Sequence, residues 1–139
     1  MRAALPFICL CLAACGSATK PPLVATDIML SKPVPGQHMS VGYLSLANNT
    51  GTAISITRVG SDAFEAVEMH ESIVEDGVAK MRRIEKLTIP ANSSVSFEPG
   101  GKHLMLMRAS STSDAASLDF YSGETLLLSV TSALTSRAN

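Results

Sequence analysis

Turn-forming residues interrupt this chain of 139 residues again and again after residue 32, and they leave little room for long helices. Pro, Gly and Asn recur in these places because they adopt the backbone angles that tight turns need. No segment between the turns keeps a helical hydrophobic period for three turns. The spacing of roughly ten residues therefore predicts an all-β domain, a sandwich or barrel of short strands. The clearest turns are 33–36 (PVPG), 48–51 (NNTG), 76–77 (DG), 90–92 (PAN) and 99–101 (PGG).

The stretches between these turns carry the β-branched and alternating residues that are typical of strands. Residues 53–59 alternate strongly, and residues 43–46 lie just before the NNTG turn, so we expect these two stretches to form one hairpin. Residues 126–130 are almost continuously apolar, which favours a central, buried strand. In all we expect about eight or nine strands, at 24–30, 39–47, 53–59, 66–72, 78–84, 94–98, 103–108, 117–120 and 125–134.

The N-terminal segment is typical of a bacterial lipoprotein signal. Arg2 precedes an apolar run, residues 3–14, that is too short to span a bilayer as a mature helix. The run ends in LAACG, residues 12–16, which resembles a lipobox, so we expect cleavage before Cys15 and lipidation of that residue. Gly16 favours the outer membrane, and the periplasmic face of the cell envelope is the expected location. An ordinary secretory signal with a chance Cys is the alternative.

These assignments divide the chain into a signal peptide (1–14), a lipidated tether (15–22) and one folded domain (23–139). Cys9 and Cys11 fall in the signal, so we expect neither a disulfide framework nor a thiolate copper site in the domain. Without Arg2, ten basic residues face twelve acidic ones. This charge is too small to indicate nucleic acid or an anionic membrane surface as a partner. Attachment to the membrane is expected through the lipid alone.

Two histidines and two methionines form a widely spaced set with the pattern H-x10-M-x21-H-x-M, namely His70, Met81, His103 and Met105. Imidazole and thioether are soft donors without charge, and together they suit Cu(I) better than Zn(II), Mg(II) or Ca(II). No Cys and no carboxylate is needed to complete four ligands. The set therefore predicts a site for one Cu(I) ion.

Hairpin geometry predicts that two of these ligands lie together. If Asp76-Gly77 is a two-residue hairpin loop, Ser72 pairs with Met81 and His70 pairs with Arg83. Met81 is then the diagonal neighbour of His70 on the same face, about 7–8 Å away. A slip of one residue in the register would put the two side chains on opposite faces.

The second pair, His103 and Met105, shares a face because the residues are two apart on one strand. Met107 continues this row, whereas Met69 is expected to point toward the core. The set has a plain alternative, since methionine is a common core filler and a lone histidine is usually solvated or hydrogen-bonded. Whether the two pairs meet in space, and whether Met107 or the His38-Met39 pair assists, stays open at this point.

The ligand pattern and its surroundings resemble the periplasmic copper chaperones of the PCuAC type. The resemblance runs from about residue 41 to residue 108 and rests on YLSLAN (43–48), EMHE (68–71), GVAKMR (77–82), IPA (89–91) and PGGKHLMLM (99–107). It implies a cupredoxin-like β-sandwich or barrel with His70, Met81, His103 and Met105 as copper ligands. Some members of the family carry a His- and Met-rich tail, and the resemblance here fades after Arg108, so we expect no second, Cu(II)-type site.

The resemblance also implies a function. It predicts a Cu(I) metallochaperone that passes copper by ligand exchange to an accepting protein, such as cytochrome c oxidase subunit II or a related assembly factor. We find no motif of an enzyme in the sequence. Two alternatives stay open, a copper or silver buffer without a specific recipient and a structural lipoprotein module that binds no metal.

Overall fold

The structure is a computed structural model that describes residues 20–110 and 113–136. The predicted signal peptide and Cys15 lie outside the described residues. Over the described ranges the chain is all β, as predicted, and holds no helix long and apolar enough to cross a membrane. The described residues form eleven strands rather than eight or nine: β1 (Leu23–Ser31), β2 (Met39–Asn48), β3 (Ile54–Ile56), β4 (Arg58–Gly60), β5 (Phe64–Glu75), β6 (Val78–Arg83), β7 (Leu87–Ile89), β8 (Ser93–Phe97), β9 (Lys102–Ala109), β10 (Ala115–Ser122) and β11 (Thr125–Thr135).

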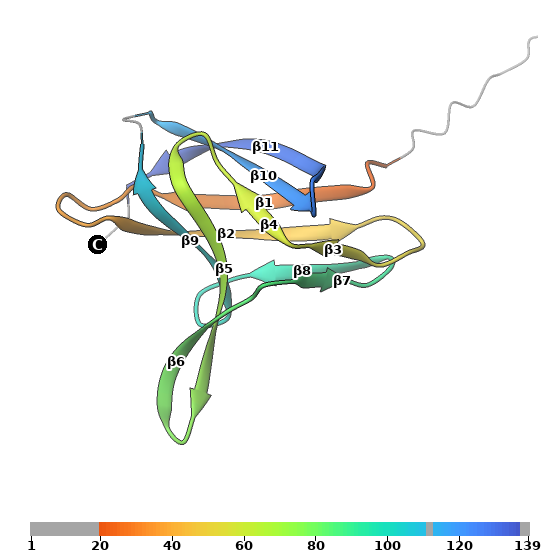
Figure 1. Ribbon diagram of the computed structural model, residues 1–139, viewed down its shortest axis with the longest axis horizontal. Helices are drawn as coiled ribbons and strands as arrows, with labels where there is room; N and C mark the ends of the chain where they lie inside the picture. The colour runs from red at the N-terminus through yellow and green to blue at the C-terminus, as the bar shows by residue number, and fades with distance from the viewer. Residues whose placement is uncertain (1–19, 111–112, 137–139) are drawn as a thin grey trace, which may run out of the picture.

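Seven of these strands close into a barrel (Figure 1). Their order is β1-β11-β10-β4-β5-β9-β2, and β2 returns to pair with β1. The pairing of β1 with β11 is parallel, and the other neighbours are antiparallel. Closure pairs the backbone groups that an open sheet would leave at its edges. Outside the barrel, β8 pairs with β2, β6 pairs with β5, and β3 and β7 form a separate two-stranded sheet.

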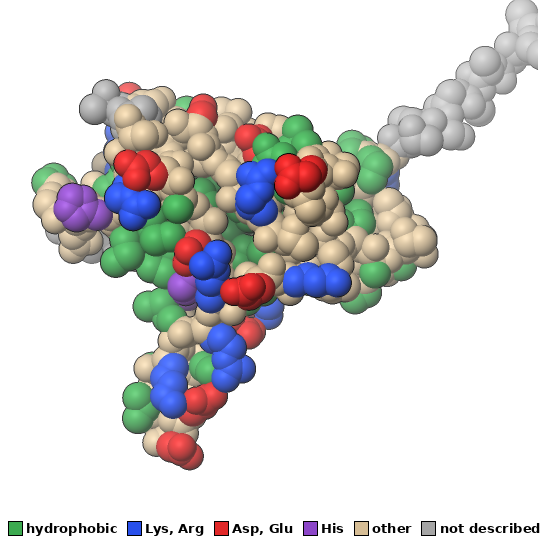
Figure 2. Space-filling model, viewed as in Figure 1, with side chains coloured by type: hydrophobic (Ala, Val, Ile, Leu, Met, Phe, Trp, Pro, Cys, Tyr) green, Lys and Arg blue, Asp and Glu red, His purple; other side chains and the backbone are tan. Residues whose placement is uncertain are grey.

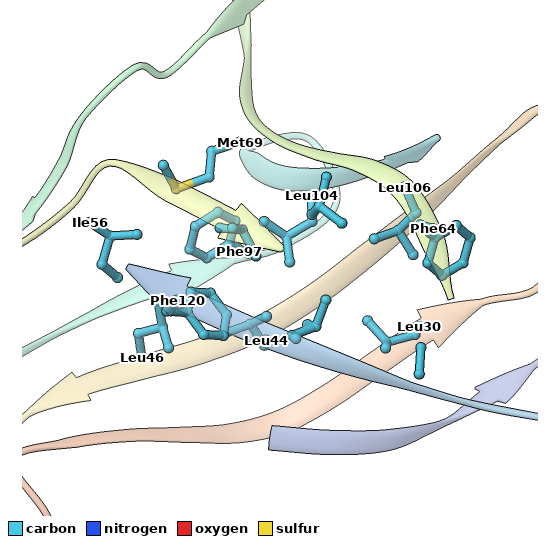
Figure 3. Packing of buried hydrophobic residues seen from close by; sticks show 14 of the residues in the cluster. Leu30, Leu44, Leu46, Ile56, Phe64, Met69, Phe97, Leu104, Leu106 and Phe120 are labelled. Carbon is cyan, nitrogen blue, oxygen red and sulfur yellow. The ribbon is translucent and has the colours of Figure 1, made fainter. Parts of the chain in front are cut away.

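Apolar side chains alternate inward along the barrel strands and fill the interior (Figure 3). Leu104 and Leu106 of β9, Leu44 of β2 and Phe120 of β10 are fully or almost fully buried there, and Met69 of β5 points inward as expected. Because side chains alternate along a strand, this arrangement sends the neighbours of Met69 and Leu104 to the outer face of the barrel. The outer face of β5 and β9 is therefore where three of the four predicted ligands, His70, His103 and Met105, lie.

The predicted hairpin between residues 43–46 and 53–59 is wrong. Strand β2 pairs with β1, β8 and β9, whereas residues 53–59 are split into β3, which pairs with β7, and β4, which pairs with β5 and β10. The break falls at Thr57, whose backbone N–H donates to the carbonyl of Tyr121 at 2.8 Å. The predicted strand at 53–59 therefore serves two sheets.

A buried asparagine explains why the chain leaves β2 in another direction. The side-chain amide of Asn48 donates to the backbone carbonyls of Thr52, Ile89 and Pro90 at 2.8, 3.1 and 3.0 Å. Its carbonyl oxygen accepts from the backbone N–H and the hydroxyl of Thr50. These bonds hold the NNTG turn against the end of β7, so the chain that follows the turn pairs as β3 with β7 and does not return to pair with β2.

The apolar run at residues 126–130 is also less buried than predicted. Strand β11 has a neighbour on each side, β1 and β10, so it is central in the sheet. Its side chains are mostly exposed or half-buried, and Leu126 is 50% exposed. The prediction of a central strand is therefore confirmed, and the prediction of burial is wrong.

One hairpin stands out from the barrel (Figure 1). The distal half of β5 and the whole of β6 project from the body, and every residue of β6 is exposed. Figure 2 shows charged side chains of both signs along this projection. Among them, Glu75 of β5 forms ion pairs with Lys80 and Arg82 of β6. The projection carries one of the predicted ligands, Met81.

Candidate metal centre

The two histidines lie side by side on the outer face of the barrel. In the antiparallel pairing of β5 with β9, His70 is directly opposite His103. Their ring centroids are 6.0 Å apart, with 41° between the ring planes. Directly opposite residues of an antiparallel pair have neighbouring side chains on one face. The long-range pairing of β5 with β9 therefore joins the two local ligand pairs that the sequence left separate.

Met81 reaches this face through the hairpin register that the sequence predicted. Strand β6 pairs with β5 so that Ser72 faces Met81 and His70 faces Arg83, which confirms the predicted register. The turn residues Asp76 and Gly77 have φ of 51° and 76°. Two positive φ angles are what a type I′ turn requires, and the Asp-Gly dipeptide supplies them at low cost. Met81 is thus the diagonal neighbour of His70, and it is 66% exposed.

Met105 completes the row on β9. It lies opposite Glu68 of β5 on one side and opposite Val41 of β2 on the other. A cavity of about 300 Å³ opens here, and three of the four predicted ligands line it. His70 is not part of the lining, but its ring is next to that of His103, which is. The lining residues are Met39, Ser40, Val41, Tyr43, Ser72, Met81, Gly100, His103 and Met105.

One ring nitrogen of His70 and one of His103 are held by a hydrogen bond. His103 Nδ1 lies 3.2 Å from the carbonyl oxygen of Gly101. A carbonyl can only accept, so this nitrogen carries the proton and Nε2 keeps its lone pair. His70 Nε2 lies 2.9 Å from a carboxylate oxygen of Glu68, and His70 Nδ1 is buried with no hydrogen-bond partner among the described residues. A histidine that binds a metal usually donates its other N–H in this way.

The donors available here are neutral and soft. Within residues 20–110 and 113–136, no group of three or more His, Cys, Asp or Glu side chains is placed to hold a metal ion. The nearest carboxylates are engaged by cations, Glu68 by Arg83 at 3.0 Å and Glu71 by Lys102 at 2.9 Å. A metal in this cavity would therefore meet imidazole and thioether donors, a kind of donor that fits Cu(I).

The structure also answers which neighbouring residues the cavity includes. Met39 lines it, because β2 runs antiparallel to β9 beside the ligand row. Met107 lies opposite Met39 but is not part of the lining, and neither is His38, which is exposed. Glu68 was not among the predicted site residues, although its position two residues before His70 puts both side chains on the same face of the strand. Met39 and Tyr43 had no such local signal, since they reach the cavity through long-range pairing.

Solved structures with the same arrangement of strands define the class of fold. This chain superposes on the structures titled "apo PmoF2 PCuAC domain" and "Copper-bound PCuAC domain from PmoF2" with TM-scores of 0.65 and 0.62. Each is 21% identical, and the matches cover 83% and 85% of this chain and 90% and 94% of those chains. Apo-DR1885 from Deinococcus radiodurans superposes with a TM-score of 0.61 at 19% identity, over 99% of this chain and 95% of that chain. The fold is the cupredoxin-like barrel of PCuAC domains.

Sequence comparison then assigns the family. Residues 23–120 match the family described as "Putative lipoprotein LpqE-like", and the chain belongs to it. A "Putative lipoprotein Lxx21020" of Leifsonia xyli is 31% identical over 96 residues, which are 66% of this chain and 57% of that protein. An "Uncharacterized protein RP573" of Rickettsia prowazekii is 32% identical over 68 residues, 48% of this chain and 38% of that protein. Each match covers less than two thirds of the relative's length.

Proposed function

We propose that this protein is a Cu(I) carrier of the cell envelope that holds one ion between His70, Met81, His103 and Met105. The observation that carries the proposal is the pairing of β5 with β9, which sets His70 against His103 on the face that Met81 and Met105 share. The likeness of the fold to a copper-bound PCuAC domain supports it. Copper is the cargo in this proposal, and no chemical reaction is assigned to the protein.

The ligand chemistry suits a carrier. Neutral imidazole and thioether donors bind Cu(I) in preference to the harder divalent ions. Met81 is 66% exposed, whereas His103 is only 9% exposed. An accepting protein therefore reaches Met81 first, and replacement of this thioether by a ligand of the acceptor begins the exchange. The half-buried His70 and the buried His103 are released last.

The lipoprotein family supports a place of action at the cell envelope. We propose that Cys15 is lipidated, that the domain stands at the periplasmic face of the envelope, and that the anchor is in the outer membrane. The family description and the name of the Leifsonia relative support a lipid anchor. The recipient we propose is cytochrome c oxidase subunit II or a related assembly factor. Buffering of copper or silver without a recipient is the competing proposal, and loss of oxidase activity on deletion that added copper restores would exclude it.

The first experiment is a Cu(I) titration of residues 16–139 against a competing chelator under reducing conditions. We expect one tight equivalent in the parent protein and its loss in the His70→Ala variant. His38→Ala is the matched control, because His38 is exposed and does not line the cavity. Equal binding by the His70→Ala and His38→Ala variants would refute the site, and no binding by the parent protein would refute the carrier function.

A further inference from the structure

Glu68 joins a proposed ligand to the base of the projecting hairpin. One of its carboxylate oxygens, Oε2, accepts from His70 Nε2 at 2.9 Å, and the other, Oε1, accepts from an Arg83 guanidinium nitrogen at 3.0 Å. The three side chains share one face, since Glu68 and His70 are two residues apart on β5 and His70 pairs with Arg83 across the strands. The side chains of Glu68 and His70 are only 25% and 15% exposed, so water competes weakly for these bonds.

The hydrogen bond to Glu68 selects the tautomer of His70. A carboxylate accepts and does not donate, so the proton of the neutral imidazole lies on Nε2 and the lone pair lies on Nδ1. That Nδ1 is buried and has no hydrogen-bond partner in the described part of the chain. A buried acceptor without a partner is unfavourable, and such an atom in a native structure calls for a ligand or another explanation.

Whereas His70 is held through Nε2, His103 is held through its other ring nitrogen, Nδ1. Its Nδ1 carries the proton, which it donates to the Gly101 carbonyl at 3.2 Å, so its free nitrogen is Nε2. Two histidines that face each other directly across β5 and β9 thus present different nitrogens. The two rings, whose centroids are 6.0 Å apart, therefore offer a lone pair on Nδ1 in one case and on Nε2 in the other.

We infer that Glu68 is a positioning residue for copper. It fixes His70 with the proton on Nε2 so that Nδ1 is the copper-binding nitrogen, Arg83 holds Glu68 in place, and His103 binds through Nε2. The inference rests on the proposed function of this site and adds to it the residue and the atoms that set its geometry. Glu65 offers a matched comparison, because it also lies on β5 and its carboxylate pairs with Arg108 of β9 and not with a proposed ligand.

The first test needs no metal. Nitrogen-15 spectra of the histidine rings, recorded about two pH units above the usual histidine pKa of about 6.5, report which nitrogen carries the proton. We expect His70 of the parent protein to be a single tautomer protonated at Nε2 and His103 to be protonated at Nδ1. The Glu68→Ala variant should give a mixture at His70. The Glu68→Gln variant should keep the single tautomer, because its amide oxygen still accepts the bond.

The second test measures copper. Changes to a hydrogen-bond partner of a ligand usually weaken metal binding about 10- to 100-fold, so we expect that loss in Glu68→Ala and a smaller one in Glu68→Gln. Glu65→Ala should bind as the parent protein does. In the copper-loaded protein the resonance of His70 Nδ1 should move, and that of His103 Nε2 should move with it. An amide spectrum of each variant checks that the fold is retained.

The outcomes separate this inference from the proposed function. If Glu68→Ala keeps the single tautomer and binds copper as Glu65→Ala does, Glu68 is an ion-pair partner of Arg83 only, and the inference is overturned. Movement of His70 Nε2 in place of Nδ1 on copper binding would overturn it as well. If the parent protein binds no copper, the carrier function fails, while the tautomer measurement still decides whether Glu68 orients His70.

Discussion

Replacing Met81 by Leu should weaken copper binding strongly without disturbing the fold. Met81 is 66% exposed on β6, so a side chain of similar size and polarity there should change the free energy of unfolding by less than about 0.5 kcal/mol. The thioether is lost, and with it one of the four proposed ligands. Met29→Leu is the matched control, since Met29 is 57% exposed on β1 and does not line the cavity.

The size of the effect follows from linkage between binding and folding. At a free Cu(I) concentration about 100 times the dissociation constant, binding raises the free energy of unfolding by about 2.7 kcal/mol. A domain of roughly 120 residues has an unfolding entropy of about 0.25 kcal/mol/K, so its melting temperature rises by about 11 °C. If the Met81→Leu variant binds about 100-fold more weakly, the same concentration adds about 0.4 kcal/mol, or about 2 °C.

The assay is thermal unfolding followed by circular dichroism, with and without Cu(I) held at a fixed free concentration by a chelator. We expect the melting temperatures of the two variants and the parent protein to agree without copper. With copper, the Met29→Leu variant should gain as much as the parent protein and the Met81→Leu variant far less. An equal gain in both variants would show that Met81 is not a ligand and that the hairpin register has no part in the site.

Three further predictions concern the fold that supports the site. Asn48→Ala should lower the free energy of unfolding by about 2–4 kcal/mol in urea denaturation, because the buried amide bonds three backbone carbonyls; a loss below about 0.5 kcal/mol would contradict this reading. Gly42→Ala should cost about 1–3 kcal/mol in the same assay, because the added Cβ would lie 2.9 Å from Leu30 Cδ2 in the core; an unchanged midpoint would show that Leu30 can move aside. The Ser117 backbone N–H, 2.7 Å from the Asp62 carboxylate, lowers the pKa of Asp62 below its ordinary value. A lowered pKa in the folded state adds stability above the unfolded pKa of about 3.9 that is lost as the pH falls through the folded value, so Asp62→Asn should flatten the loss of stability below about pH 4. If the variant and the parent protein lose the same stability as the pH falls below about 4, the role of Asp62 is refuted.

Local interactions could be predicted from the sequence because they depend on residues close together in the chain. The register of β5 with β6 follows from Asp76-Gly77, whose two positive φ angles fit one type of two-residue turn. The inward direction of Met69 follows from the alternation of side chains along a strand, because the next residue, His70, was expected to point away from the core. Most strands were located for the same reason, but β7 was missed because three residues carry too little pattern.

Long-range pairing was beyond the sequence. Residues 43–46 and 53–59 look like a hairpin by their pattern, yet the hydrogen bonds of Asn48 to the end of β7 direct the chain elsewhere. The apolar run of β11 has the composition of a buried strand, yet the closed barrel exposes part of it. Strand patterns record which residues suit a pleated sheet, and neighbours from distant parts of the chain decide which face is covered.

The sequence by itself determined the kind of candidate site, two imidazoles and two thioethers in two local pairs, because side-chain chemistry and hairpin geometry are local properties. Only the tertiary structure decided that the pairs meet. The antiparallel pairing of β5 with β9 sets His70 against His103, and that of β2 with β9 adds Met39 and Tyr43 to the cavity. Such pairings are fixed by how the barrel closes around its core, a property of the whole chain that no short segment contains.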